Sequence, residues 1–165
     1  MDLNVQISNG SLTMISQTAD YALRAVIVLG AQPGVPLTTQ QIAARTRVPG
    51  GYLSKVLQAL GRGGLVEAQR GLGGGYVLTR PLEELSVLDV INAVDPLKRI
   101  DRCPLGLPAH EGRMCSLHQR LDQGIALVES LFGQTTIRQL LAEENPSRPL
   151  CEVAAIDSGK TCTGP

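Results

Sequence analysis

Residues 37–78 read LTTQQIAARTRVPGGYLSKVLQALGRGGLVEAQRGLGGGYVL, and they say more about the architecture than any other part of the chain. Their first part predicts two short helices, over 39–47 and 49–60, because apolar residues recur at helical spacing on each side of a brief turn. Their second part predicts strands over 65–69 and 76–79 around a glycine-rich turn. Two short helices followed by a hairpin are typical of a winged helix-turn-helix.

Capping residues and apolar spacing predict how these two helices begin and pack. Thr38 or Thr39 can cap the first helix. Its Ile42 and Ala43 are expected to face inward. Pro49 suits the first turn of the second helix, and the apolar stripe of that helix is expected to face the core. The stripe consists of Tyr52, Leu53, Val56, Leu57 and Leu60.

Further helices are predicted on both sides of this stretch. The run 16–32 can be capped by Ser16 or Thr18, and Ser86 can cap a helix over 86–95. Both have apolar residues on one side, which we expect to be buried. These residues are Ala19, Leu23, Val26 and Ile27 in the first helix and Val87, Val90, Ile91 and Val94 in the second.

A long amphipathic helix is predicted over 115–132, and a short helix over 135–144 follows it. The apolar residues of the long helix recur every three to four positions and are Leu117, Leu121, Ile125, Val128 and Leu131. An exposed amphipathic helix beyond a small domain usually buries its stripe on a partner, so we expect a dimerisation helix. Packing back onto its own domain is the alternative.

Together these elements predict a mainly α protein with a small β-hairpin wing, that is, a winged helix-turn-helix plus a long dimerisation helix. The winged helix-turn-helix domain is expected over 14–80. The connecting helix, a loop with Cys and His, and the dimerisation helix are expected over 81–144. Residues 1–13 and 145–165 show no such pattern and are predicted to be a disordered extension and a disordered tail.

Charge is divided unevenly along a chain whose formal net charge is zero. Residues 14–80 carry seven Lys and Arg against two acids, whereas residues 81–165 carry eight against twelve. This division suggests that a polyanion contacts only the first half. Uneven solvated surfaces without a ligand are the alternative. With no Trp, one Phe and three Tyr, the core must be aliphatic, which favours helix packing.

The sequence also argues against several classes of protein. No apolar run is long enough to span a membrane and no secretion signal is seen, so a cytoplasmic protein without a membrane partner is expected. Cysteines in such a protein are thiols or metal ligands more often than disulfides. They are Cys103, Cys115, Cys151 and Cys162, of which the last two are interpreted as ordinary thiols. No arrangement of Ser, His and Asp or of paired carboxylates indicates an enzyme.

Candidate DNA contacts follow from the helix-turn-helix, because its second helix enters the major groove with its N-terminal polar residues against base edges. Those positions are Gly51, Ser54 and Lys55, with Gln58 one turn further on. Arg70 in the hairpin turn suits a minor groove. The same turn looks like a glycine-rich phosphate loop, but a strand follows it where a nucleotide site needs a helix, so nucleotide binding is disfavoured.

The chain resembles the Rrf2 family of bacterial transcription regulators in three segments. These are ISQTADYALRA, the 37–78 stretch quoted above and SVLDVINAVD. That family includes an iron-sulfur cluster regulator and a nitric-oxide-sensitive repressor, and the resemblance covers about residues 14–144. It implies a homodimer with crossed long helices. It also implies that Gly51, Ser54 and Lys55 read bases and that Arg70 enters the minor groove.

The resemblance implies a metal-binding loop as well, since sensors of the family hold an iron-sulfur cluster with three Cys before the dimerisation helix. In RCPLGLPAHEGRMCSLH, Cys103 and Cys115 match the outer two, but Ala109 stands at the middle position. His118 matches a histidine ligand used by one branch of the family. His110 directly follows the position of the missing Cys.

Three interpretations of this loop stay open. Two Cys and two His could hold a two-iron cluster or another metal, because thiolate and imidazole suit both. Asp20, in ADYALR, falls where some family members offer an acidic ligand from the other subunit. Cys103 and Cys115 alone could form a redox-sensitive thiol pair. The third interpretation is a loop that binds no cofactor.

These observations lead us to expect a homodimeric transcription regulator, a repressor, that binds a pseudo-palindromic operator in double-stranded DNA. The Cys and His loop would sense redox state, iron-sulfur status or nitric oxide. The alternative is a redox- or metal-responsive protein-interaction module that has the winged-helix fold and no specific DNA binding.

Overall fold

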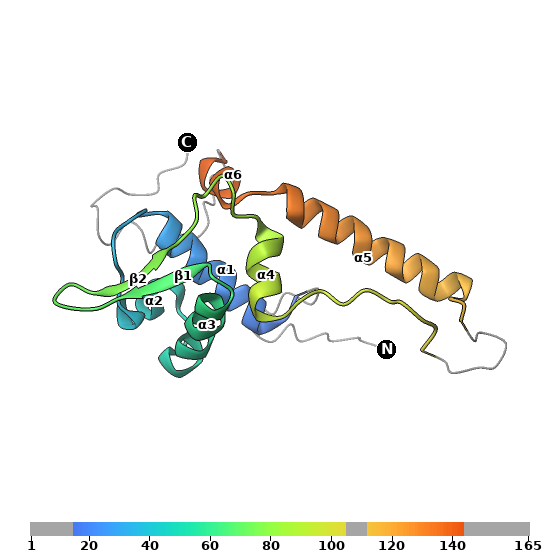
Figure 1. Ribbon diagram of the computed structural model, residues 1–165, viewed down its shortest axis with the longest axis horizontal. Coiled ribbons are helices and arrows are strands. Elements are labelled where there is room, and N and C mark those ends of the chain that lie inside the picture. The colour runs from blue at the N-terminus through green and yellow to red at the C-terminus, as the bar shows by residue number, and fades with distance from the viewer. Residues whose placement is uncertain (1–14, 105–111, 144–165) are drawn as a thin grey trace, which may run out of the picture.

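A computed structural model describes residues 15–104 and 112–143 of the chain. The segments predicted to be disordered, 1–13 and 145–165, lie outside the described residues. The order of the described elements confirms the predicted fold class, mainly α with a β-hairpin wing (Figure 1). The elements are α1 (Gln17–Gly30), α2 (Thr39–Thr46), α3 (Gly50–Arg62), β1 (Val66–Gln69), β2 (Gly75–Leu78), α4 (Val87–Val94), α5 (Ser116–Gln134) and α6 (Ile137–Ala142).

Side-chain caps determine where four of these helices begin. At the start of α1, the Ser16 hydroxyl accepts a hydrogen bond from the backbone N–H of Ala19. The other three helices begin with a capping box, in which two side chains three residues apart each accept the other's backbone N–H. The boxes are Thr38 with Gln41 for α2, Ser86 with Asp89 for α4 and Thr136 with Gln139 for α6. The capping residues predicted from the sequence are thereby confirmed, and each contributes about 1 kcal/mol to helix stability.

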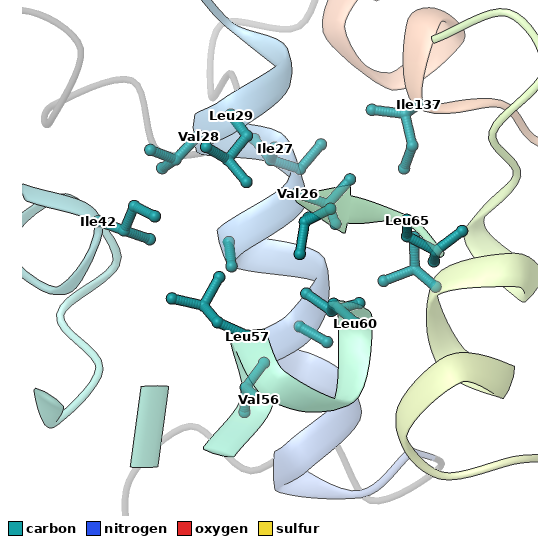
Figure 2. Packing of buried hydrophobic residues seen from close by; sticks show 14 of the residues in the cluster. Val26, Ile27, Val28, Leu29, Ile42, Val56, Leu57, Leu60, Leu65 and Ile137 are labelled. Atoms are coloured by element: carbon teal, nitrogen blue, oxygen red, sulfur yellow. The ribbon is translucent and has the colours of Figure 1, made fainter. Parts of the chain in front are cut away.

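The hydrophobic core forms around α1, whose residues Ala22, Ala25 and Val26 are fully buried. Helices α2, α3, α4 and α6 all contact α1. Figure 2 shows Leu57 of α3 and Ile137 of α6 lying around α1 in the same cluster. One core therefore supports both the helix-turn-helix and the helices that follow the wing.

One residue of the predicted stripe on α3 is not buried. Tyr52 is 59% exposed, and its ring lies edge-on to Tyr21 of α1 with the centroids 6.3 Å apart. The prediction that Tyr52 faces the core is wrong, because it lies at the edge of the stripe and its long side chain reaches the surface. The remaining four residues of the stripe are buried as expected: Leu53, Val56, Leu57 and Leu60.

The wing is fixed to the body at its base and ends in a glycine-rich turn. Strands β1 and β2 pair antiparallel, and Leu37, just before α2, forms a β-bridge with Tyr76. A Cβ on Gly75 would lie only 2.5 Å from the carbonyl of Leu37, so this close approach requires glycine. Gly71 and Gly73 in the turn have φ of 110° and 80°, which other residues adopt rarely.

Helix α5 extends away from the body as a long arm, and the linker after α4, residues 95–104, runs beside it (Figure 1). At the base of the arm, Val87 N–H donates to the carbonyl of Thr135 and Ile137 N–H donates to the carbonyl of Leu85. These bonds join the end of α5 to the start of α4. Within the described residues, no helix is both long and apolar enough to cross a membrane.

Candidate functional site

The outer face of α3 carries the predicted base contacts. Gly51, Lys55 and Gln58 are exposed and lie on one side of the helix, opposite its buried stripe. Ser54 is half-buried, and its hydroxyl donates to the carbonyl of Gly50 at 3.0 Å. A Cβ on Gly50 or Gly51 would meet nothing within 4 Å, so the backbone at the start of α3 is open to a large ligand.

Lys55 and Arg70 are exposed, and neither forms an ion pair with a described residue. Arg70 follows β1 directly, at the start of the glycine-rich turn of the wing. By contrast, Arg80, Arg99 and Arg138 each pair with a carboxylate. The two predicted DNA-contacting cations are thus left with their charge uncompensated by the surrounding side chains.

A second group of side chains lies beside α3. Arg24 lies 5.8 Å from the ring centroid of Tyr21, the residue that Tyr52 contacts edge-on. Arg24 also pairs with Asp20 at 2.6 Å. Asp20, a candidate metal ligand, therefore lies on α1 with an arginine partner in this chain and outside the Cys and His group described next.

Three candidate metal ligands converge at the far end of the arm. Cys103 comes from the linker, Cys115 is the N-cap residue of α5, and His118 lies in the first turn of α5. The Cys115 Sγ lies 3.1 Å from His118 Nδ1 and 4.0 Å from the Cys103 Sγ, which itself lies 3.6 Å from His118 Nδ1. Cys103 and His118 are each only 9% exposed. His110 and Ala109 lie outside the described residues.

The separations of these donor atoms can be compared with those around a tetrahedral metal ion. Metal–sulfur bonds of about 2.3 Å and metal–nitrogen bonds of about 2.0–2.1 Å place two sulfurs about 3.8 Å apart and a sulfur and a nitrogen about 3.5 Å apart. The three observed separations lie within about half an ångström of these values. Two thiols and one imidazole thus fit three positions of a tetrahedral N/S site and leave a fourth for another ligand.

The electrostatic surroundings favour the thiolate of Cys115. The backbone N–H of His118 and then its imidazole lower the pKa of the Cys115 thiol from 9.0 to about 7. Thiolates are the form that binds metal and that reacts with oxidants. Near neutral pH, a large share of Cys115 is therefore in the reactive form.

An arginine in the linker binds two carboxylates of α5. The Arg99 guanidinium donates to both oxygens of Asp122, at 2.7 and 2.6 Å, and to Glu129 at 3.1 Å. The backbone N–H of Ile100 also donates to Asp122 at 2.9 Å. We name this group, Arg99, Ile100 N–H, Asp122 and Glu129, the Arg99 clamp. It was not predicted from the sequence, although Asp122 follows His118 by one helical turn, which is a signal for a shared helix face.

The charges of the Arg99 clamp reinforce one another. Arg99, and then the Ile100 N–H, lower the pKa of Asp122 from 3.8 to about 2. Asp122 therefore stays ionised at neutral pH. Its contribution to stability is complete above pH 4 and is lost as the pH falls towards 2.

The chain is similar to known proteins both in sequence and in structure. A family model for Rrf2, described as an iron-dependent transcriptional regulator, matches residues 15–143. A relative named as a helix-turn-helix-type transcriptional regulator in Haemophilus influenzae is 32% identical over 130 residues, which cover 78% of this chain and 86% of the relative. A protein of Mycobacterium tuberculosis with the same kind of name is 33% identical over 125 residues, 74% of this chain and 78% of the relative.

Solved structures show the same fold. CymR, the global cysteine regulator of B. subtilis, superimposes with a TM-score of 0.64 and 25% identity, over 76% of this chain and 94% of CymR. T. potens IscR superimposes with a TM-score of 0.65 and 24% identity, over 79% of this chain and 88% of IscR. At that identity the likeness to IscR supports the fold alone.

The lowered pKa of Cys115 predicts how the reactivity of its thiol depends on pH. In reduced, metal-free protein, alkylation of Cys115 by iodoacetamide should be half-maximal near pH 7, because only the thiolate reacts. The His118→Ala variant should move this midpoint part of the way towards 9. The shift should be partial because the variant removes the imidazole but keeps the backbone N–H of residue 118. Peptide mass spectrometry after timed alkylation measures both midpoints, with Cys115→Ser as the control for peptide assignment. A midpoint near 9 in the unaltered protein would contradict the assignment.

Proposed function

The chain belongs to the Rrf2 family and is a DNA-binding transcription regulator, and we propose that it acts as a homodimeric repressor on a pseudo-palindromic operator. We expect it to be a cytoplasmic protein, since bacterial DNA lies in the cytoplasm. The observation that carries the proposal is the outer face of α3 with the wing beside it, where Lys55 and Arg70 are exposed and have no ion-pair partner within residues 15–104 and 112–143. The alternative, a protein-interaction module without specific DNA binding, is less well supported, because the family model that matches describes a transcriptional regulator.

Each residue of the proposed interface has a distinct part in binding. Lys55 donates to guanine acceptors or to phosphate, and Gln58, one turn on, donates to and accepts from a base edge. Gly51 lets the backbone of α3 approach the DNA closely. Ser54 contributes less in our proposal, because its hydroxyl already donates within the helix. Arg70 enters an A·T-rich minor groove, where narrow geometry concentrates negative potential.

The arm supports the proposed homodimer. Four leucines of α5 are between 50% and 73% exposed in the single chain, an unusual amount for large apolar side chains on one helix. They are Leu117, Leu121, Leu127 and Leu131. Full burial of an exposed leucine is favourable by about 1.5–3 kcal/mol, and covering the part that is still exposed here would contribute roughly half to three quarters of that for each side chain. A second copy with the same exposed leucines is the partner that a two-fold interface requires.

The sensing part of the proposal rests on Cys103, Cys115 and His118. These residues would hold an iron-sulfur cluster or a single metal ion, with Asp20 of the second subunit or His110 as further candidate ligands. When bound, an iron-sulfur cluster supplies redox chemistry and sensitivity to nitric oxide. In its absence, Cys103 and Cys115 are close enough to act as a thiol pair, which is the second interpretation.

DNA binding through α3 gives the central test. Lys55→Ala should weaken binding to an operator obtained by selection from random DNA by about tenfold or more, because a base or phosphate contact is lost. The variant should also reduce the difference in affinity between operator DNA and scrambled DNA. Lys98→Ala, which removes the same charge from the exposed linker, should change neither value. Fluorescence anisotropy measures both affinities, and an unchanged preference in Lys55→Ala would exclude base reading by Lys55.

The proposed dimer can be tested independently of DNA. Leu121→Glu should shift the protein from dimer to monomer at micromolar concentration, because a charge would be buried in an apolar interface. The side chain is 50% exposed in the single chain, so the fold should be kept. Gln119→Glu adds the same charge to an exposed position on the other side of α5 and should leave the dimer intact. Sedimentation velocity distinguishes the two species, and a monomeric unaltered protein would refute the proposed dimer.

Metal content tests the sensing proposal. Protein purified without oxygen should contain iron and sulfide, or one metal ion per chain, and should lose them in Cys103→Ala. Cys151→Ala, which removes a thiol outside the proposed site, should retain them. Visible absorption together with iron, sulfide and zinc analysis gives the result. A colourless protein without metal would leave DNA binding untouched and favour the thiol pair.

A further inference from the structure

The linker that carries Cys103 has no regular secondary structure to hold it in place. Residues 95–104 form neither helix nor strand, so no backbone ladder joins them to α5. Cys115 and His118, in contrast, are held by the helix itself, because they are the N-cap and a first-turn residue of α5. The position of Cys103 relative to these two donors therefore depends on what attaches the linker to the helix.

The Arg99 clamp supplies the ion pairs and a backbone hydrogen bond that attach the linker to α5. The planar guanidinium meets Asp122 with two parallel hydrogen bonds, which fixes direction as well as distance. Asp122 is 9% exposed, so this pair is shielded from solvent on the carboxylate side. The bond from Ile100 N–H to Asp122 holds the linker backbone itself, and not only a flexible side chain.

The clamp lies one helical turn from the candidate metal site. Asp122 follows His118 by four residues, and Glu129 follows Asp122 by seven, so all three face the linker from the same side of α5. Cys103 follows Ile100 by three residues. A short tether between an anchored backbone and a donor atom raises the effective concentration of that donor at its site.

We propose that Arg99 is a positioning residue of the Cys and His site, which holds the linker on α5 so that Cys103 reaches Cys115 and His118. The inference rests on the proposed function of that site. Arg99 touches neither sulfur nor imidazole, and it acts through Asp122 and the Ile100 backbone. In this proposal, loss of the clamp weakens the attachment of the linker to α5 and so the placement of Cys103, while Cys115 and His118 keep their positions on the helix.

Two measurements on the full chain test this role. The first is the affinity for Co²⁺, followed by the sulfur-to-cobalt charge-transfer absorption under reducing, oxygen-free conditions. The second is the rate at which diamide oxidises the thiols of Cys103 and Cys115 to a disulfide in metal-free protein, with diamide reduced to its hydrazine and both thiol protons taken up by it. Peptide mapping identifies the disulfide.

Arg99→Ala should lower the Co²⁺ affinity by about tenfold or more, which is the usual effect of removing a residue that holds a metal ligand in place. It should slow disulfide formation between Cys103 and Cys115 by a similar factor. Asp122→Asn, which keeps the size and the acceptor for Ile100 N–H, should lower both values to a lesser extent. In the double variant the two effects should not add, because both changes remove the same ion pair.

Arg102→Ala is the matched control. It makes the same change three residues further on, next to Cys103. The ion pair that it removes, between Arg102 and Asp101, lies at the surface, where the two side chains are 84% and 78% exposed. Both measurements should stay at the values of the unaltered protein. Circular dichroism establishes that each variant is folded, and Asp122→Asn carries the test if Arg99→Ala does not fold.

The outcomes separate the clamp from the sensing proposal. Unchanged disulfide rates in Arg99→Ala and Asp122→Asn, or an equal loss in Arg102→Ala, would overturn the positioning role. If the unaltered protein binds no Co²⁺, the metal-site proposal is contradicted, yet the disulfide rates still decide whether Arg99 positions Cys103.

Discussion

Burial of α1 organises the whole body of the protein. Its alanines are small enough for neighbours to approach closely, and α2, α3, α4 and α6 all pack against it. The helix proposed to face the DNA, α3, and the two helices at the base of the arm therefore pack on the same helix. Helix α4 contacts both α1 and α3, so a shift of α4 would disturb the packing of α3.

The uneven charge of the chain has a structural counterpart. Acids of the second half pair with cations of the body and the arm, as Asp122 and Glu129 do with Arg99 and as Glu83 does with Arg138. Lys55 and Arg70 in the first half have no such partners among the described residues. The zero net charge thus conceals a division in which two exposed cations of the proposed DNA interface are unpaired among the described residues, while Arg99 and Arg138 are paired with carboxylates.

Features set by neighbours in sequence were predicted from spacing, whereas features set by distant contacts were either missed or expected only from the family resemblance. Capping boxes and helical stripes depend on residues three or four apart, so Thr38, Ser86 and the leucines of α3 could be assigned from spacing. Tyr52 was misplaced because spacing does not say how far the edge of a stripe is covered. Cys115 and His118 share a turn of α5, whereas the approach of Cys103 to them was expected only through the family resemblance. The pairing of Arg99 with Asp122 joins positions 23 residues apart and was not predicted. The predicted DNA contacts and the domain limits remain predictions.

The two backbone bonds at the base of α5 have a mechanical consequence. With 19 residues, the helix is about 28 Å long; backbone bonds join one end of it to the start of α4, and the Arg99 clamp joins it to the linker that follows α4. A tilt of about 10° at that joint carries the tip through about 5 Å, more than the rise of one base pair. Such a tilt would strain the two bonds at Val87 and Ile137, the packing of α4 on α5 and the Arg99 clamp together, so these contacts jointly set how stiffly the cysteines are held relative to the body.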